Sequence, residues 1–181
     1  MTLPSLLTYP DFRLRVVAEP VTAFDDGLVT LANDLVAAVV AAPAIGLAAS
    51  HIGVLRRVIA VRPSEAEAVR VYVNPVIAWA SAETMINEEG SVSMPGVSAE
   101  IERPRAVRVG YSDLQGISCV EEAEGFHAAV LQHEIDQLDG VFWIVRLSRL
   151  KRERVIKRYQ KLGSPSASFA TLPPRDFPIH S

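Results

Sequence analysis

Apolar side chains recur at three- and four-residue steps between residues 25 and 42. Leu28, Leu31, Leu35 and Val39 therefore share one face of a predicted helix. A proline directly follows this stretch and is expected to end the helix, because proline has no backbone N–H to continue the hydrogen-bond ladder. The pattern indicates an amphipathic helix that buries a single apolar stripe.

Two further helices are predicted towards the carboxyl end. The first begins at Gly125 and is closed by Gly140, because glycine is the favoured residue just past a helix end. We expect the apolar stripe of this helix to be buried against a sheet. The second runs from Leu147 to Leu162 and is followed by residues 164–181, a Pro/Ser-rich tail without periodicity that we expect to be loosely held.

The strands are predicted from runs of β-branched residues and from alternation. Residues 58–61 and 69–73 are rich in valine and isoleucine, and we expect Asn74-Pro75 to end the second run. Apolar and polar residues alternate from Val107 onwards, and a turn over Asp113–Gly116 leads into a returning strand. The last pair predicts a β-hairpin.

Composition narrows the class of protein. The chain has 181 residues, of which 49% are hydrophobic and 22% charged, which suits a single globular domain over 1–163. Its 18 basic and 21 acidic residues give a net charge of −3, so we expect no sequence-specific nucleic-acid binding.

The single Cys119 excludes an intramolecular disulfide and suits the cytoplasm. The longest apolar stretch, Leu35–Ala49, is shorter than the ~18 residues of a membrane span.

His133 and Glu134 lie in the segment QHEIDQ of the second predicted helix, one residue short of the metal-binding pattern H-E-x-x-H. In that pattern the two histidines face one metal ion and the glutamate moves the proton. Here Gln137 replaces the second histidine. Taken alone, the segment is also compatible with a core histidine whose hydrogen bonds are satisfied.

Two more segments complete a recognisable order. Residues 45–53 read IGLAASHIG, residues 88–96 read EEGSVSMPG, and residues 132–140 read QHEIDQLDG. This order resembles the peptide deformylases, whose motifs run GxGLAAxQ, EGCLS and QHExDHLxG. The resemblance implies an α+β fold with antiparallel sheets around a central HExxH-type helix and a carboxy-terminal helix.

The resemblance also implies a chemistry, which is metal-dependent hydrolysis of the N-formyl group from the first methionine of nascent proteins. In the family a cysteine and two histidines hold a divalent metal, commonly iron or else zinc. Carried over to this chain, Glu134 is the proton-transfer residue, and His51 together with the backbone N–H of Val92 stands where the oxyanion is stabilised. Of the three metal ligands only His133 is present, because Ser91 and Gln137 occupy the other two positions.

These replacements change the expected metal chemistry. A hydroxyl and a neutral amide lack the charge and the softness that iron or zinc requires, so we expect no metal or only a weakly bound divalent metal. Two alternatives remain open. His51, His133 and Glu134 could share a displaced metal ion, or Ser91 could act as a nucleophile beside His133 without a metal.

The resemblance further implies a cleft for the methionine side chain and the backbone of a nascent chain. Its residues in this sequence would be Ile45, Gly46, Glu89, Gly90, Phe126, Ala129 and Val130. Some of these apolar residues, Phe126 and Val130 above all, could equally be ordinary core.

Eight cations surround a single acid in the last predicted helix and just before it. They are Arg146, Arg149, Lys151, Arg152, Arg154, Lys157, Arg158 and Lys161, and the acid is Glu153. A solvated helix face explains such a run, and the resemblance adds possible contact with the ribosome. Three functions are thus open: a working deformylase, a catalytically silent binder of N-terminal peptides or the ribosome, and a metal-free hydrolase.

Overall fold

The computed structural model describes residues 3–42, 44–63 and 66–163. The expected helix-ending proline at position 43 and the tail over 164–181 lie outside this part of the chain. Among the described residues, no helix is long and apolar enough to cross a membrane.

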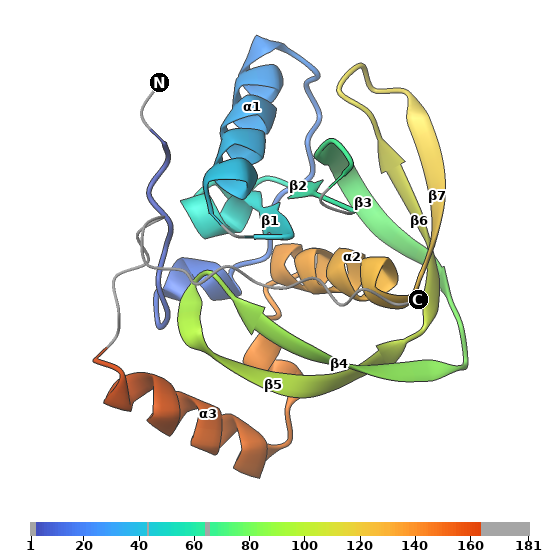
Figure 1. Ribbon diagram of the computed structural model, residues 1–181. Coiled ribbons are helices and arrows are strands. Elements are labelled where there is room, and N and C mark those ends of the chain that lie inside the picture. The colour runs from blue at the N-terminus through green and yellow to red at the C-terminus, as the bar shows by residue number, and fades with distance from the viewer. Residues whose placement is uncertain (1–2, 43, 64–65, 164–181) are drawn as a thin grey trace.

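In the described part of the chain, seven strands form two antiparallel sheets (Figure 1). Five of them make one sheet in the order β1-β2-β3-β6-β7, and the other two make a separate hairpin. The bounds of the larger sheet are β1 Gly46–Ala48, β2 Val58–Val61, β3 Arg70–Ala80, β6 Ala106–Ser112 and β7 Ser118–Glu124. Those of the hairpin are β4 Thr84–Ser91 and β5 Met94–Pro104.

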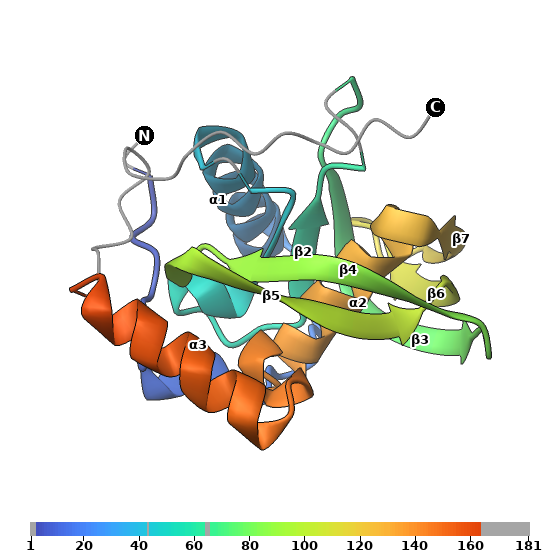
Figure 2. The same cartoon turned by 60° about the horizontal axis from the view of Figure 1, so that its bottom comes forward.

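Among residues 3–42, 44–63 and 66–163, three α-helices pack on these sheets, namely α1 (Asp26–Ala41), α2 (Gly125–Leu138) and α3 (Arg149–Lys161). Helix α2 lies between the five-stranded sheet and the β4–β5 hairpin, and α1 packs against β1 and β2 (Figure 1). Helix α3 lies outside, beside β5 (Figure 2). Short 3₁₀ turns occupy Phe12–Arg15, Ala49–Ile52 and Trp143–Arg146. The α+β fold with a central α2 is therefore confirmed.

The helix ends follow local chemistry. Asp25 caps α1, its carboxylate accepting the Leu28 N–H at 3.1 Å. Gly140 follows α2 with φ of 73°. A side chain there would meet the carbonyl oxygen of Arg15 at 2.8 Å, so both the backbone conformation and the close approach require glycine.

The apolar face of α2 packs onto the larger sheet. Ala128, Leu131, Ile135 and Leu138 are buried there against side chains that include Ile59 of β2. These four positions recur at the helical period, as the sequence predicts. The opposite face of α2 is left for a pocket.

Strand β3 differs from its predicted form, because it continues through Asn74-Pro75 to Ala80. Asn74 has φ of 52°, and the register with β6 shifts between Val73 and Val76. The amide of Asn74 replaces ladder bonds: it accepts the Val21 N–H and donates to the Val21 carbonyl, both at 2.8 Å. A bulge of this kind accommodates a proline, which cannot donate to the ladder.

Candidate functional site

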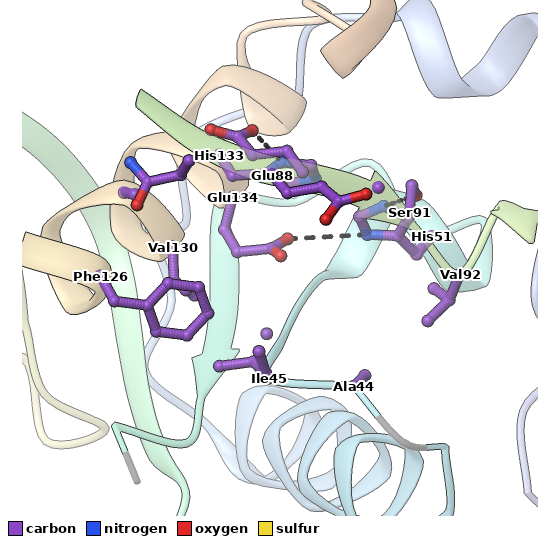
Figure 3. A pocket seen from close by; sticks show the side chains of 15 residues that line it. Ala44, Ile45, His51, Glu88, Ser91, Val92, Phe126, Val130, His133 and Glu134 are labelled. Atoms are coloured by element: carbon purple, nitrogen blue, oxygen red, sulfur yellow. Dashed lines mark hydrogen bonds and ion pairs between the residues drawn. The ribbon is translucent and has the colours of Figure 1, made fainter. Parts of the chain in front are cut away.

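One pocket lies between β1, β4 and the exposed face of α2 (Figure 3). All residues proposed for the site from the sequence line it, except Gln137. Sequence reasoning did not assign Asn87 or Glu88 to the pocket, and both belong to the lining. Ala44, at the position of the first family glycine, lines it as well.

The apolar wall of the pocket comes from α2 and from the segment before β1. Phe126, Ala129 and Val130 follow one another at helical spacing and face the pocket, and Ile45 stands opposite Phe126 (Figure 3). Val130 also packs against the buried cluster between α2 and the larger sheet, so it belongs both to the pocket wall and to the edge of the core. The four residues therefore form a lined cavity open to a ligand.

His51 is buried beside the pocket, with 1% of its surface exposed. Its Nδ1 lies 3.1 Å from the Ala48 nitrogen and 3.2 Å from the Ala48 carbonyl oxygen. Its Nε2 lies 3.5 Å from the Ser91 hydroxyl. Burial, with the nearby charge of His133, lowers the pKa of His51 to about 3, so its imidazole is neutral near pH 7.

Glu134 is a buried acid at the pocket wall. Its Oε2 has no hydrogen-bond partner within the described residues, and the His51 Nδ1 lies 3.8 Å away. Burial raises the pKa of Glu134 to about 7, although the positive charge of His133 opposes this rise. The Glu134 side chain can lie here only because residue 46 is glycine, since a Cβ on Gly46 would be 2.9 Å from the Glu134 Cγ and Oε1 atoms.

His133 is fixed by a carboxylate behind it. Its Nδ1–H donates to Glu89 Oε2 at 2.8 Å, which leaves Nε2 as the unprotonated nitrogen of the neutral ring. Burial lowers the pKa of His133, but the hydrogen bond to Glu89 and the charges of Glu134 and Glu89 outweigh burial, so the net direction is upward. Glu89 thus sets both the orientation and the tautomer of this imidazole.

A chain of buried ion pairs leads from Glu89 to the surface. Arg103 donates to Glu89 with Nε at 2.5 Å and Nη2 at 3.0 Å, and its Nη1 donates to Asp136 at 2.8 Å. Arg146 donates to both oxygens of Asp136: its Nε lies 2.9 Å from Oδ2, the oxygen that Arg103 also contacts, and its Nη2 donates to Oδ1. Burial raises the pKa of Glu89, but the hydrogen bonds from His133 and Arg103 outweigh it and the net direction is downward. Sequence reasoning gave Arg103 and Asp136 no role.

The side chains at the two replaced ligand positions are hydrogen-bonded to groups other than His133. Ser91 Oγ accepts the Ser93 N–H at 3.1 Å and lies 3.5 Å from His51 Nε2, and no hydrogen bond joins it to His133 in the described part of the chain. The Gln137 amide donates to the Leu14 carbonyl at 2.7 Å and does not line the pocket.

The donor set does not fit a late divalent metal. Within the described residues, no group of three His, Cys, Asp or Glu side chains is placed to hold a metal ion, so the alternative set of His51, His133 and Glu134 does not form one. A hydroxyl, one imidazole and an amide that is bonded elsewhere supply neither the charge nor the geometry of such a site.

The comparisons with known proteins agree on one family. The family model described as polypeptide deformylase matches residues 4–153. A "peptide deformylase-like" protein of Brucella melitensis is 53% identical over 90% of this chain and 99% of its own length. A peptide deformylase of Phenylobacterium zucineum is 44% identical over 89% of this chain and 97% of its own. The crystal structure of the Ehrlichia chaffeensis peptide deformylase superposes with a TM-score of 0.83 at 32% identity, covering 90% of this chain and 98% of that one.

Proposed function

Since this chain belongs to the polypeptide deformylase family, we propose that its pocket binds the amino-terminal residues of nascent polypeptides with little or no metal-dependent deformylation. The observation that carries this proposal is the Gln137 amide, which donates to the Leu14 carbonyl at 2.7 Å and is not part of the pocket lining that contains His133. With Ser91 at the thiolate position, one imidazole remains where three ligands are needed. Without a bound metal ion, deformylation lacks the group that would activate the attacking water.

The backbone around the pocket supports peptide binding. Strand β1 is the outer strand of its sheet, and Gly46 pairs with Val61 while the Ile45 carbonyl accepts the Arg62 N–H at 2.7 Å. Because hydrogen-bonding direction alternates along an antiparallel pair, the N–H and C=O of Gly46 face away from β2. An extended peptide can pair with this edge and place its first side chain against Phe126.

Calorimetric titration with formyl-Met-Ala-Ser in the presence of a metal chelator tests this proposal. We expect saturable binding at one site per chain, weakened about tenfold or more by Phe126→Ala because the apolar contact is lost. The matched control is Phe12→Ala, which removes an aromatic ring that is 70% exposed and outside the pocket. Absence of binding under these conditions, or equal loss in both variants, would contradict the proposal.

A second candidate is a metal-free hydrolase, favoured by the contact of Ser91 with His51. The Ser91 hydroxyl lies 3.5 Å from His51 Nε2, and Glu134 lies 3.8 Å from the other ring nitrogen. This order is that of a nucleophile, a base and an orienting acid, at distances longer than working hydrogen bonds. Labelling of the protein by a fluorophosphonate, lost in Ser91→Ala, would support this candidate, and absence of labelling would remove it.

We further propose that α3 supplies an electrostatic contact with ribosomal RNA in the cytoplasm. Six of its cations are exposed, and only Arg149 among them pairs with Glu153, at 3.0 Å, in the described part of the chain. The other five are Lys151, Arg154, Lys157, Arg158 and Lys161. Cosedimentation with ribosomes that weakens steeply with salt is expected. Cosedimentation unchanged by reversing three of these charges would contradict the contact.

A further inference from the structure

Glu134 is the one acid of the pocket lining with a buried carboxyl oxygen that has no hydrogen bond among the described residues. Its side chain is 5% exposed, and it belongs to the pocket lining. The neighbouring His51 Nδ1, at 3.8 Å, is beyond hydrogen-bond distance and already lies 3.1 Å from the Ala48 N–H. Buried polar atoms are normally paired, so an unpaired carboxyl oxygen at a pocket wall indicates a donor that comes from a ligand.

The charges around the pocket indicate the sign of that donor. Three carboxyl groups, those of Glu88, Glu89 and Glu134, belong to the lining, and no lysine or arginine of the described chain does. His133 is the basic group of the lining with a raised pKa, and its Nδ1–H is already bonded to Glu89. Glu89 is bonded to Arg103 and His133, and Glu88 is exposed and accepts the Ser98 hydroxyl at 2.5 Å. Glu134 is therefore the acid left to meet a positively charged group.

The position of Glu134 relative to β1 indicates where on a peptide that positive group would be. Gly46 lies directly against Glu134, since a Cβ on this glycine would be 2.9 Å from Oε1. A peptide that pairs with the free edge of β1 and begins opposite Gly46 has its first residue next to the carboxyl group. The first residue of an unmodified peptide carries an α-ammonium group with three N–H donors.

We propose that the pocket selects peptides with a free α-amino terminus over N-formylated ones, with the α-ammonium group donating to Glu134 Oε2. The inference rests on the proposed function, because it assigns a ligand class to the same pocket. A formylated terminus is neutral and has a single N–H. It therefore cannot form an ion pair with Glu134 and can donate only one hydrogen bond. The chain would then recognise N-termini from which the formyl group has already been removed.

Calorimetric titration with Met-Ala-Ser, formyl-Met-Ala-Ser and acetyl-Met-Ala-Ser tests the preference. At about pH 7 the free α-amino group is mostly protonated. A charge-assisted hydrogen bond in a buried site lowers the Kd by about tenfold or more. We expect Met-Ala-Ser to bind about tenfold tighter than both blocked peptides. Glu134→Gln is expected to equalise the three affinities, because it keeps the shape and removes the charge.

Two control variants make the test specific. Glu100→Gln removes the same charge from an exposed position on β5 and is expected to keep the preference. Glu88→Gln addresses the rim carboxylate, and loss of the preference in this variant but not in Glu134→Gln would overturn the assignment to Glu134. Thermal unfolding of each variant verifies that it is folded.

The outcomes separate this inference from the proposed function. If the formylated peptide binds as tightly as Met-Ala-Ser, or tighter, the preference is overturned while peptide binding stands. If none of the three peptides binds, both proposals fail. A preference for Met-Ala-Ser that persists in Glu134→Gln overturns the role of this carboxyl group.

Discussion

Gly46→Ala is expected to disturb the pocket from the side of β1. The added methyl group would lie 2.9 Å from two atoms of Glu134 and 3.1 Å from Val130 Cγ1, well inside normal contact. Overpacking of this kind typically destabilises a protein by about 1–3 kcal/mol, and the reduced freedom of the unfolded chain returns about 0.4–1 kcal/mol. A net destabilisation of up to about 2.6 kcal/mol follows, together with weaker peptide binding because either Glu134 or β1 must move.

Gly110→Ala supplies the matched control within the same sheet. A Cβ at Gly110 would meet only Val76 Cγ2, at 3.7 Å, which is ordinary contact, so this variant is expected to be neutral or slightly stabilised. Urea unfolding of the parent and the two variants measures the difference, and titration with Met-Ala-Ser measures binding. Equal stability and equal affinity of the two alanine variants would refute the close packing of Gly46 on Glu134.

Three further predictions concern the buried charges and the replaced ligands. Arg103→Met should destabilise the fold by about 3–5 kcal/mol in urea unfolding, because it leaves Glu89 without its buried partner; a loss below about 1 kcal/mol would contradict the ion-pair chain. Glu134→Gln should have a larger free energy of unfolding than the parent at high pH. This difference should shrink as the pH falls from about 7 towards 4.5, the pKa of the carboxyl group in the unfolded chain. The reason is that the raised folded-state pKa of Glu134 makes the parent take up a proton on folding in this pH range. A stability difference independent of pH would contradict the raised pKa. In the double variant Ser91→Cys/Gln137→His, added zinc or nickel should raise the melting temperature, because a metal that binds the folded state stabilises that state. An unchanged melting temperature would show that the cleft geometry, and not only the ligand set, has changed.

The elements predicted from the sequence are those whose buried face is apolar. The period of Leu28, Leu31, Leu35 and Val39 matches α1, and the hairpin of β6 and β7 follows its alternation. Strand β4 gives no such signal, because its buried positions are Asn87, Glu89 and Ser91. A strand that turns polar residues towards a pocket does not show the apolar alternation by which a strand is recognised.

The pocket lining was predictable through the order of three short segments, but its internal contacts were not. Arg103 reaches Asp136 across 33 residues of sequence, and Gln137 reaches Leu14 across 123. Local periodicity and spacing carry no information on such contacts, since they depend on how the hairpin and the amino-terminal segment close over α2. Against the family motifs GxGLAAxQ and QHExDHLxG, His51 stands at the glutamine position and Gln137 at the second histidine position. The sequence shows this exchange but not the direction in which each side chain points.

Formate release is the decisive quantity for a pocket that binds N-termini without metal-dependent deformylation. The protein is incubated with formyl-Met-Ala-Ser and stoichiometric iron, nickel or cobalt under reducing, oxygen-free conditions, and formate is measured against a protein-free blank and an authentic peptide deformylase treated in parallel. We expect formate at or near the blank with each metal, while the same preparation binds the peptide by calorimetry. Multiple turnovers that depend on added metal and are abolished by His133→Ala would contradict the proposal and identify the chain as a working deformylase.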